Sequence, residues 1–178
     1  EAVESQELAP APLVKQWTFE ELEAELPRAR RGRSWEQGRV ALAKAQCVKC
    51  HRVNEQGNST GPDLTYVGRR FDERALLESI VLPSRVIDEK YRLSNYALNS
   101  GKVITGRSVG VSATVITVQA DSLRPETVLI NRAEIEQTTP ASLSPMPSGL
   151  VNVLTMEEIL DVIAYLKSGG DPQADVYQ

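Results

Sequence analysis

The two cysteines and the single histidine of this chain stand together in one pentapeptide, Cys47-Val48-Lys49-Cys50-His51. The C-x-x-C-H spacing is the attachment pattern of a c-type haem. On a helical turn, residues three and four apart share a face, so Cys47 and Cys50 both reach one porphyrin edge while His51 directs a ring nitrogen at the iron. The sequence therefore predicts one covalently attached haem c, with His51 as an iron ligand.

Three other uses of these residues fit the sequence less well. A redox dithiol normally opens a helix after a strand and needs no histidine, whereas residues 35–45 ahead of Cys47 have a helical pattern. Zinc would need a further ligand from a carboxylate, because the chain has no second pair of cysteine or histidine residues. A disulfide between residues three apart closes a very small loop and stabilises little. The redox dithiol and the zinc site stay open as alternatives.

The other axial position of such an iron takes a second ligand or stays open. Ligation by two histidines of the chain is excluded, so the two methionines are the candidates. Met156 lies in the first turn of an expected helix, where ordinary packing explains it. Met146 stands between Pro145 and Pro147 in an irregular loop. We therefore expect His51 and Met146 to be the two metal ligands.

The length and composition are those of an ordinary globular protein. The 178 residues can bury one good core with a small second unit, and 41% of them are hydrophobic and 25% charged. A net charge of −4 argues against nucleic acid as a partner. No apolar run is long enough to span a bilayer, and no signal peptide opens the chain. Because bacteria attach haem to C-x-x-C-H outside the cytoplasmic membrane, we expect a periplasmic or otherwise exported protein whose signal lies upstream.

Helical patterns occupy both ends of the chain. A capping box at Thr18 begins a short helix, and the helix ahead of the haem motif starts at about Ser34. Gly38 lies inside that second helix, which indicates a close crossing with another helix. Apolar spacing predicts a third helix over 72–82, and a capping box at Thr155 begins a last one.

Residues 91–139 have a different pattern, in which β-branched residues alternate with polar ones between turn signals. This pattern predicts four or five short antiparallel strands inserted into a helical domain. The expected fold class is therefore mainly α with a small inserted antiparallel β unit, α+β overall. The expected divisions are a linker at 1–17, a helical extension at 18–33, the first part of the core at 34–90, the β unit at 91–139, the methionine loop and last helix at 140–168, and a tail at 169–178.

A wider set of residues matches a known pattern over roughly 35–168, namely Cys47–Asn54, Gly61–Leu64, Gly68, Arg69, Leu77–Ile80, Pro83, Ser84, Gly101, Gly106, Ser144, Met146–Leu150, Asp161 and Ala164–Leu166. Together these residues resemble a class I cytochrome c, and more narrowly the planctomycete-type haem-binding domain family. The first 34 residues lie outside the resemblance. Leu42 departs from it, because many relatives have an aromatic residue there against Gly38.

The resemblance implies the class I cytochrome c helical fold around one haem. It implies that the Pro62 carbonyl accepts a hydrogen bond from the His51 ring, that Leu64 is a cofactor-binding position, and that Arg69 or Arg70 faces a haem propionate. A solvated basic turn is the alternative for the two arginines. Family members commonly form the C-terminal module of larger exported proteins, so a dehydrogenase domain in the same full-length protein is an expected partner.

Two protein ligands leave no site for a substrate on the iron, so we expect a carrier of single electrons between redox proteins and not an enzyme. A basic rim for brief encounters would comprise Lys44, Lys49, Arg52, Arg69 and Arg70, unless these are unconnected surface charges.

The alternative function is a haem peroxidase or gas sensor with a displaceable methionine, although no distal histidine exists to act as acid or base. A third reading makes the β insert a binding module.

Overall fold

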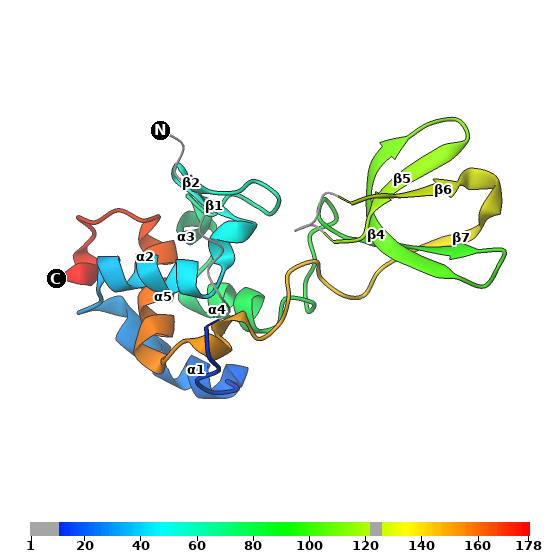
Figure 1. The fold of residues 1–178 in the computed structure, drawn as a ribbon. Coiled ribbons are helices and arrows are strands. Elements are labelled where there is room, and N and C mark those ends of the chain that lie inside the picture. The colour runs from blue at the N-terminus through cyan, green and yellow to red at the C-terminus, as the bar shows by residue number, and fades with distance from the viewer. Residues whose placement is uncertain (1–10, 122–125) are drawn as a thin grey trace. The chain divides into compact units, whose positions relative to one another are not determined.

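The chain forms two compact units in a computed structural model that describes residues 11–121 and 126–178 (Figure 1). One unit comprises the described residues up to Val81 together with Ser148–Gln178, and the other comprises the described part of Leu82–Pro147. The first unit is mainly helical and contains the Cys47–His51 turn. The second unit contains the strands of the larger sheet.

The prediction of a mainly α, class I cytochrome c fold is wrong. Within the described residues the fold is α+β, with 37% helix, 21% strand, a five-stranded antiparallel sheet and a two-stranded sheet. The strands close a hydrophobic core of their own around Tyr96, Val118 and Ile130. Because this core is separate from the core of the helices, the strands form a compact unit of their own and are not a small addition to a helical domain.

The helical unit is built from short elements. Its helices are α1 (Phe19–Glu25), η1 (Leu26–Arg30), α2 (Trp35–Lys44), η2 (Cys47–Lys49), α3 (Val67–Arg70), α4 (Glu73–Val81), η4 (Leu150–Val153), α5 (Met156–Ser168) and η5 (Asp175–Tyr177), where η denotes a 3-10 helix. A short hairpin of β1 (Arg52–Val53) and β2 (Gln56–Gly57) follows η2. The capping boxes at Thr18 and Thr155 are both present as expected. Helix α2 begins where the sequence predicts, and the Ser34 side chain caps it.

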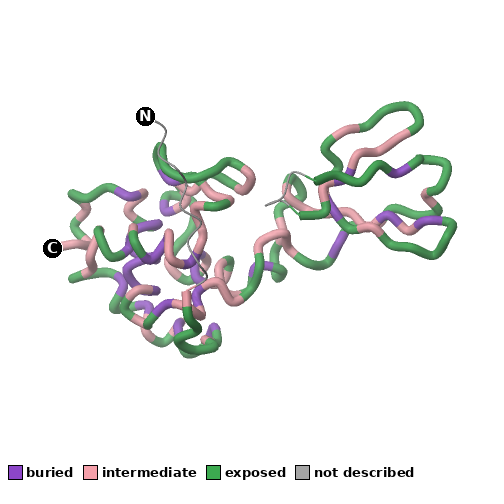
Figure 2. Tube along the Cα trace, viewed as in Figure 1, coloured by how far each residue is buried: buried purple, intermediate pink, exposed green. Residues whose placement is uncertain are grey.

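Helices α2 and α5 make the central contact of this unit. A Cβ on Gly38 would lie 2.5 Å from the backbone oxygen of Asp161 and 2.9 Å from Cβ of Tyr165, so only glycine allows the two helices to approach this closely. The close crossing expected at Gly38 is therefore present. Eight consecutive residues of α5, Ile159–Leu166, are buried (Figure 2). Helix α5 is thus the centre of the helical unit's core (the first core), with α2, η1, α3 and α4 packed against it.

The N-terminal residues form part of this core. Phe19 and Leu22 of α1 are buried in it. The backbone N–H groups of Val14 and Lys15 donate to the Asn152 carbonyl, and Trp17 Nε1 donates to the Leu154 carbonyl at 3.0 Å. The segment before α1 is consequently tied to η4 and to the start of α5.

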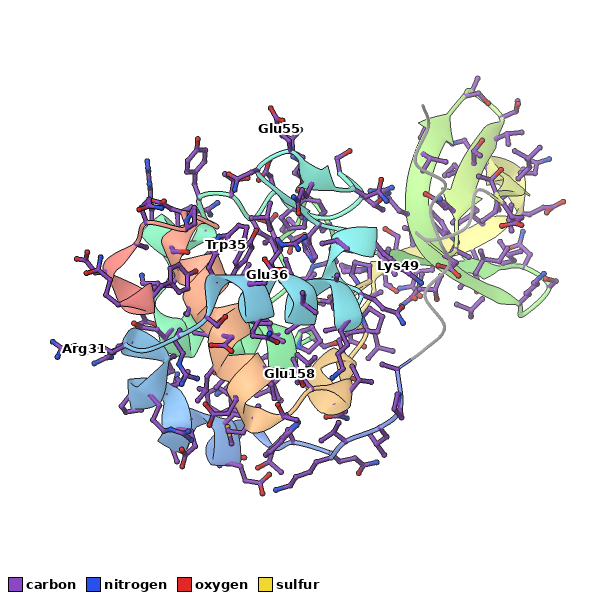
Figure 3. The ribbon with its side chains drawn as sticks, turned by 60° about the vertical axis from the view of Figure 1, so that its left-hand side comes forward. Arg31, Trp35, Glu36, Lys49, Glu55 and Glu158 are labelled. Carbon is purple, nitrogen blue, oxygen red and sulfur yellow. The ribbon has the colours of Figure 1, made fainter. Side chains whose placement is uncertain are left out.

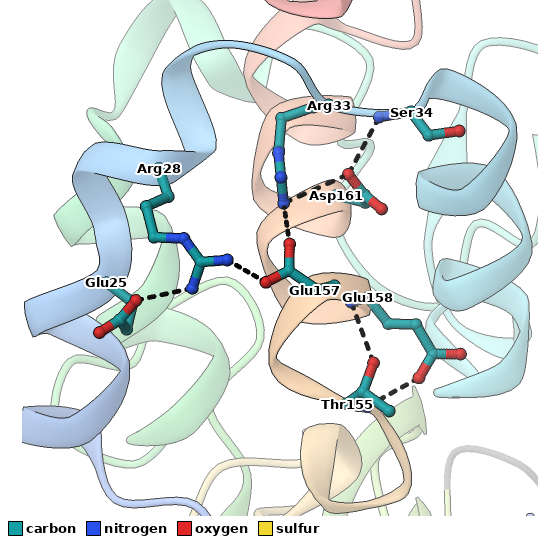
Figure 4. Close-up of polar contacts among 8 residues, drawn as sticks. All are labelled: Glu25, Arg28, Arg33, Ser34, Thr155, Glu157, Glu158 and Asp161. Carbon is teal, nitrogen blue, oxygen red and sulfur yellow. Dashed lines mark hydrogen bonds and ion pairs between the residues drawn. The ribbon is translucent and has the colours of Figure 1, made fainter.

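Arg33 and Asp161 join α2 to α5 beside the helix crossing (Figure 4). The Ser34 backbone N–H donates to Asp161 Oδ1 at 3.0 Å, and Arg33 also bonds to Glu157 at 2.9 Å. Burial raises the pKa of Asp161, although the Ser34 hydrogen bond and the Arg33 charge act in the opposite direction. Arg28 binds the other oxygen of Glu157, so two arginines share one carboxylate.

The second unit is an antiparallel sheet with strand order β6-β5-β4-β3-β7. The strands are β3 (Ser94–Leu98), β4 (Val103–Val111), β5 (Val115–Gln119), β6 (Val128–Asn131) and β7 (Ile135–Pro140), and a 3-10 turn, η3 (Arg132–Glu134), joins the last two. Strand β4 pairs with β3 along its first half and with β5 along its second, with a register shift between Ser108 and Gly110. The expected antiparallel strands are present, apart from 122–125, which lie outside the described residues.

Candidate haem-attachment site

The Cys47–His51 turn begins where α2 ends. Gln46 has a left-handed backbone, with φ of 62°, which interrupts the helix after Lys44 and starts a new direction. The His51 N–H then donates to the Cys47 carbonyl at 2.9 Å, which closes one helical turn across the motif. Both thiols and the imidazole therefore come from a single turn, as the spacing predicts.

The His51 ring is held from one side. Its Nδ1 lies 2.8 Å from the Pro62 carbonyl oxygen, which is the hydrogen bond that the resemblance implies. A carbonyl can only accept, so Nδ1 carries the proton and the lone pair is on Nε2. Gly61 packs against the ring, because a Cβ at that position would lie 2.9 Å from His51 Cε1. The imidazole is thus presented in the tautomer that a metal ligand needs.

The loop that carries Pro62 is itself braced. Arg52 bonds to Asp63 through Nε at 3.0 Å and through Nη2 at 2.8 Å, and the Leu64 N–H donates to the Arg52 carbonyl at 2.7 Å. Hydrogen bonds from Thr65, together with those from Arg52, lower the pKa of Asp63 to about 2. Asp63 therefore stays ionised across the physiological range and holds the loop beside His51.

The two cysteines differ from a reactive dithiol. Both are half-buried, and no disulfide joins them. Burial raises the pKa of the Cys47 thiol to about 12, whereas a redox-active C-x-x-C pair needs a lowered thiol pKa. In residues 11–121 and 126–178, no group of three or more His, Cys, Asp or Glu side chains is placed to hold a metal ion. Two unbridged thiols and one imidazole with its Nε2 lone pair are the donor set of a c-type haem.

The remaining positions of the predicted site lie in the same unit, with one exception. Leu64 is half-buried and packs against the first core. Arg69 and Arg70 end α3 and are exposed. The Arg69 guanidinium lies 4.8 Å from the ring centre of Tyr66, and that of Arg70 lies 5.5 Å from the ring centre of Phe71. Whether Arg69 or Arg70 faces a haem propionate stays a prediction.

The exception is Met146, which belongs to the second unit. It is half-buried, and its N–H donates to Ser144 Oγ at 3.1 Å. Its role as an iron ligand stays a prediction. Met156, the other methionine, begins α5 and packs half-buried against the first core, which is the ordinary packing expected for it.

Two of the five basic residues expected at the rim are paired. Lys44 bonds to Glu158 at 2.7 Å, and Arg52 bonds to Asp63. Lys49 is exposed on the motif turn, where Figure 3 labels it. The unpaired positive charge of the rim is therefore smaller than the sequence count indicates.

The bracing of His51 includes residues that sequence reasoning did not single out for this purpose. In the sequence, Gly61 belongs only to the residues that carry the family resemblance, because its contact with the imidazole forms only in the folded loop. Asp63 and Arg52 are eleven residues apart and meet because Arg52 also forms a parallel β-bridge with Asp63. In the sequence, an arginine and an aspartate eleven residues apart are only a weak indication of a salt bridge.

A scan against protein-family models and a search of the curated proteins found no match to this chain. Within the described residues, no helix is both long enough and apolar enough to cross a membrane.

Proposed function

We propose that Cys47, Cys50 and His51 hold one covalently attached haem and that the protein transfers single electrons. The observation that carries the proposal is the geometry at His51, where the bond from Nδ1 to the Pro62 carbonyl leaves Nε2 as the ligand atom. When bound, the haem supplies an iron that alternates between Fe(III) and Fe(II).

The residues around the motif have separate tasks in this proposal. The Cys47–His51 turn fixes the two thiols and the imidazole relative to one another, so that attachment and ligation involve one rigid segment. The hydrogen bond to the Pro62 carbonyl orients the imidazole, Gly61 leaves room for the ring, and the Arg52–Asp63 pair keeps their loop in place. A ligand that does not move is suited to electron transfer, because little rearrangement accompanies the change in iron charge.

The proposal extends to partners and location. Redox proteins outside the cytoplasm, among them a dehydrogenase domain in the same full-length protein, would exchange electrons with this chain. Exposed Lys49, Arg69 and Arg70 offer positive charges for brief, salt-sensitive contacts on a chain whose net charge is −4.

The experiment that tests the proposal is production of the chain as an exported protein in a bacterium that attaches haem to C-x-x-C-H. We expect a red protein whose visible spectrum reports low-spin iron, and whose iron cycles reversibly between two oxidation states. The double variant Cys47→Ser, Cys50→Ser is the matched control and should lose the covalent haem. A wild-type chain that is colourless under these conditions would overturn the proposal.

A further inference from the structure

A small, mainly apolar pocket in the first unit is lined in part by Val48 of the Cys47–His51 turn. Its volume is about 150 Å³, and most of its lining is apolar, from Leu42, Ala43, Val48 and Val53, with Arg39 at the wall as well. The Arg39 guanidinium is paired with Glu36. Gly57 completes the wall with backbone only. Val48 is one of the two residues between the cysteines, so anything bound in this pocket touches the motif turn.

A larger open groove of about 600 Å³ lies in the same unit. Trp35, Tyr66 and Tyr165 supply aromatic surface, and residues of the β1–β2 hairpin supply polar groups. Figure 3 labels Trp35 at the start of α2 and Glu55 on the hairpin. Arg52 and Asp63 of this groove are paired with each other, and Glu55 is the other charged residue of its lining. The groove therefore disfavours an anion and suits a neutral group that carries a hydroxyl donor.

The pocket and the groove adjoin, because Val53, Gln56 and Tyr165 line both. Gln56 is the polar side chain at this junction that offers both a donor and an acceptor on one amide. An apolar cavity of about 150 Å³ is large enough to bind benzene. The arrangement is therefore a mainly apolar pocket that can hold one aromatic ring, next to the Gln56 amide and then to an open polar groove.

We propose that this pair of hollows binds a small phenol. Its ring occupies the inner pocket between Leu42 and Val48, its hydroxyl bonds to Gln56, and a polar substituent extends into the outer groove. The mainly apolar lining of the inner pocket disfavours a sugar ring, because most of its hydroxyls would lose hydrogen bonds there. The site is separate from the residues proposed to hold the haem, because Cys47, Cys50 and His51 do not line the pocket or the groove.

The test uses the full chain as isolated and 4-methylphenol as the probe. Binding is followed by calorimetry and by ligand-observed saturation-transfer NMR, neither of which needs a haem signal. We expect saturable binding, weaker binding of toluene, and no competition from methyl glucoside. If the protein carries no haem but still binds the probe, the proposed function fails while this inference holds.

Leu42→Phe fills the inner pocket and should weaken binding about tenfold or more. Val40→Phe adds the same ring on the exposed side of the same helix and should leave binding unchanged. Circular dichroism checks that Leu42→Phe is folded, and Ala43→Leu is a second filling variant if it is not. Gln56→Leu should reduce the affinity for 4-methylphenol to that for toluene.

The inference would be overturned by absence of saturable 4-methylphenol binding, or by unchanged binding in both filling variants. It would also be overturned if methyl glucoside bound in preference to the phenol, because the groove alone would then be the site.

Discussion

His51 Nδ1 donates a hydrogen bond of 2.8 Å to the carbonyl oxygen of Pro62, eleven residues further along the chain. The bond fixes the ring tautomer and makes Nε2 a stronger donor to a metal. Gly61 allows this geometry, because its missing side chain leaves room for the ring.

Gly61→Ala should therefore disturb the imidazole. The added Cβ would lie 3.0 Å from Nδ1, so the ring must move and the bond to Pro62 must lengthen. We expect a higher reduction potential, because His51 becomes a weaker donor, and a loss of about 1–3 kcal/mol in the free energy of unfolding. Protein-film voltammetry measures the potential. Gly110→Ala in the second unit is the control, and an equal shift in both variants would contradict the argument.

Met146 is the second iron ligand that we expect from the sequence. On that hypothesis, Met146→Ala should abolish the weak long-wavelength sulfur-to-iron band of the oxidised protein and allow the reduced protein to bind carbon monoxide. Met156→Ala should keep the band and only lower stability, since Met156 packs against the first core. Visible spectra of the two variants decide between them. Loss of the band in Met156→Ala alone would show that the ligand assignment is wrong, and carbon monoxide binding by the wild type would favour a gas sensor.

Gly38→Ala should destabilise the first unit through the crossing of α2 and α5. The new Cβ would lie 2.5 Å from the Asp161 carbonyl oxygen, so the helices must separate, at a cost of about 1–3 kcal/mol or more. Urea unfolding provides the measurement. Val40→Ala, at an exposed position of the same helix, should change stability by less than about 0.5 kcal/mol. Equal midpoints for the two variants would show that the crossing is not tight.

Asp161→Asn should change how stability depends on pH. Burial raises the pKa of Asp161 in the folded state, so its contribution to stability is present below its unfolded pKa of 3.8 and is lost as pH rises through the folded value. The stability of the wild type relative to Asp161→Asn should therefore decline as pH rises from 3.8. Arg33, Glu157 and Glu158 also act on this carboxylate, and all three remain in the variant.

Glu158→Gln should change the pH dependence of stability in the opposite direction to Asp161→Asn. Burial also raises the pKa of Glu158, but hydrogen bonds from Lys44 and Thr155 outweigh it, and the pKa lies below its usual 4.5. The advantage of the wild type over this variant should be present above 4.5 and disappear as pH falls. Urea unfolding at several pH values measures both variants, and parallel trends in the two would contradict the assignments.

The sequence was sufficient for features that depend on local chemistry. Thr18 and Thr155, each followed three residues later by a glutamate, predict the starts of two helices. Alternating β-branched residues predict strands. The prediction of the fold class was wrong because the alternation of apolar and polar residues does not show whether the strands have a core of their own. Here they do, around Tyr96, Val118 and Ile130. The groove at Trp35 and Tyr165 was also missed, since these residues are 130 apart (165 − 35) and only the packing of α2 on α5 brings them together.

The most direct test of the central claim is mass spectrometry of the exported protein under denaturing conditions. The account predicts that the intact chain carries the added mass of one haem, and that digestion leaves this mass on the peptide containing Cys47 and Cys50. Cys47→Ser with Cys50→Ser should carry none. A wild-type chain of unmodified mass, with both thiols open to alkylation after export in a haem-attaching host, would contradict the account.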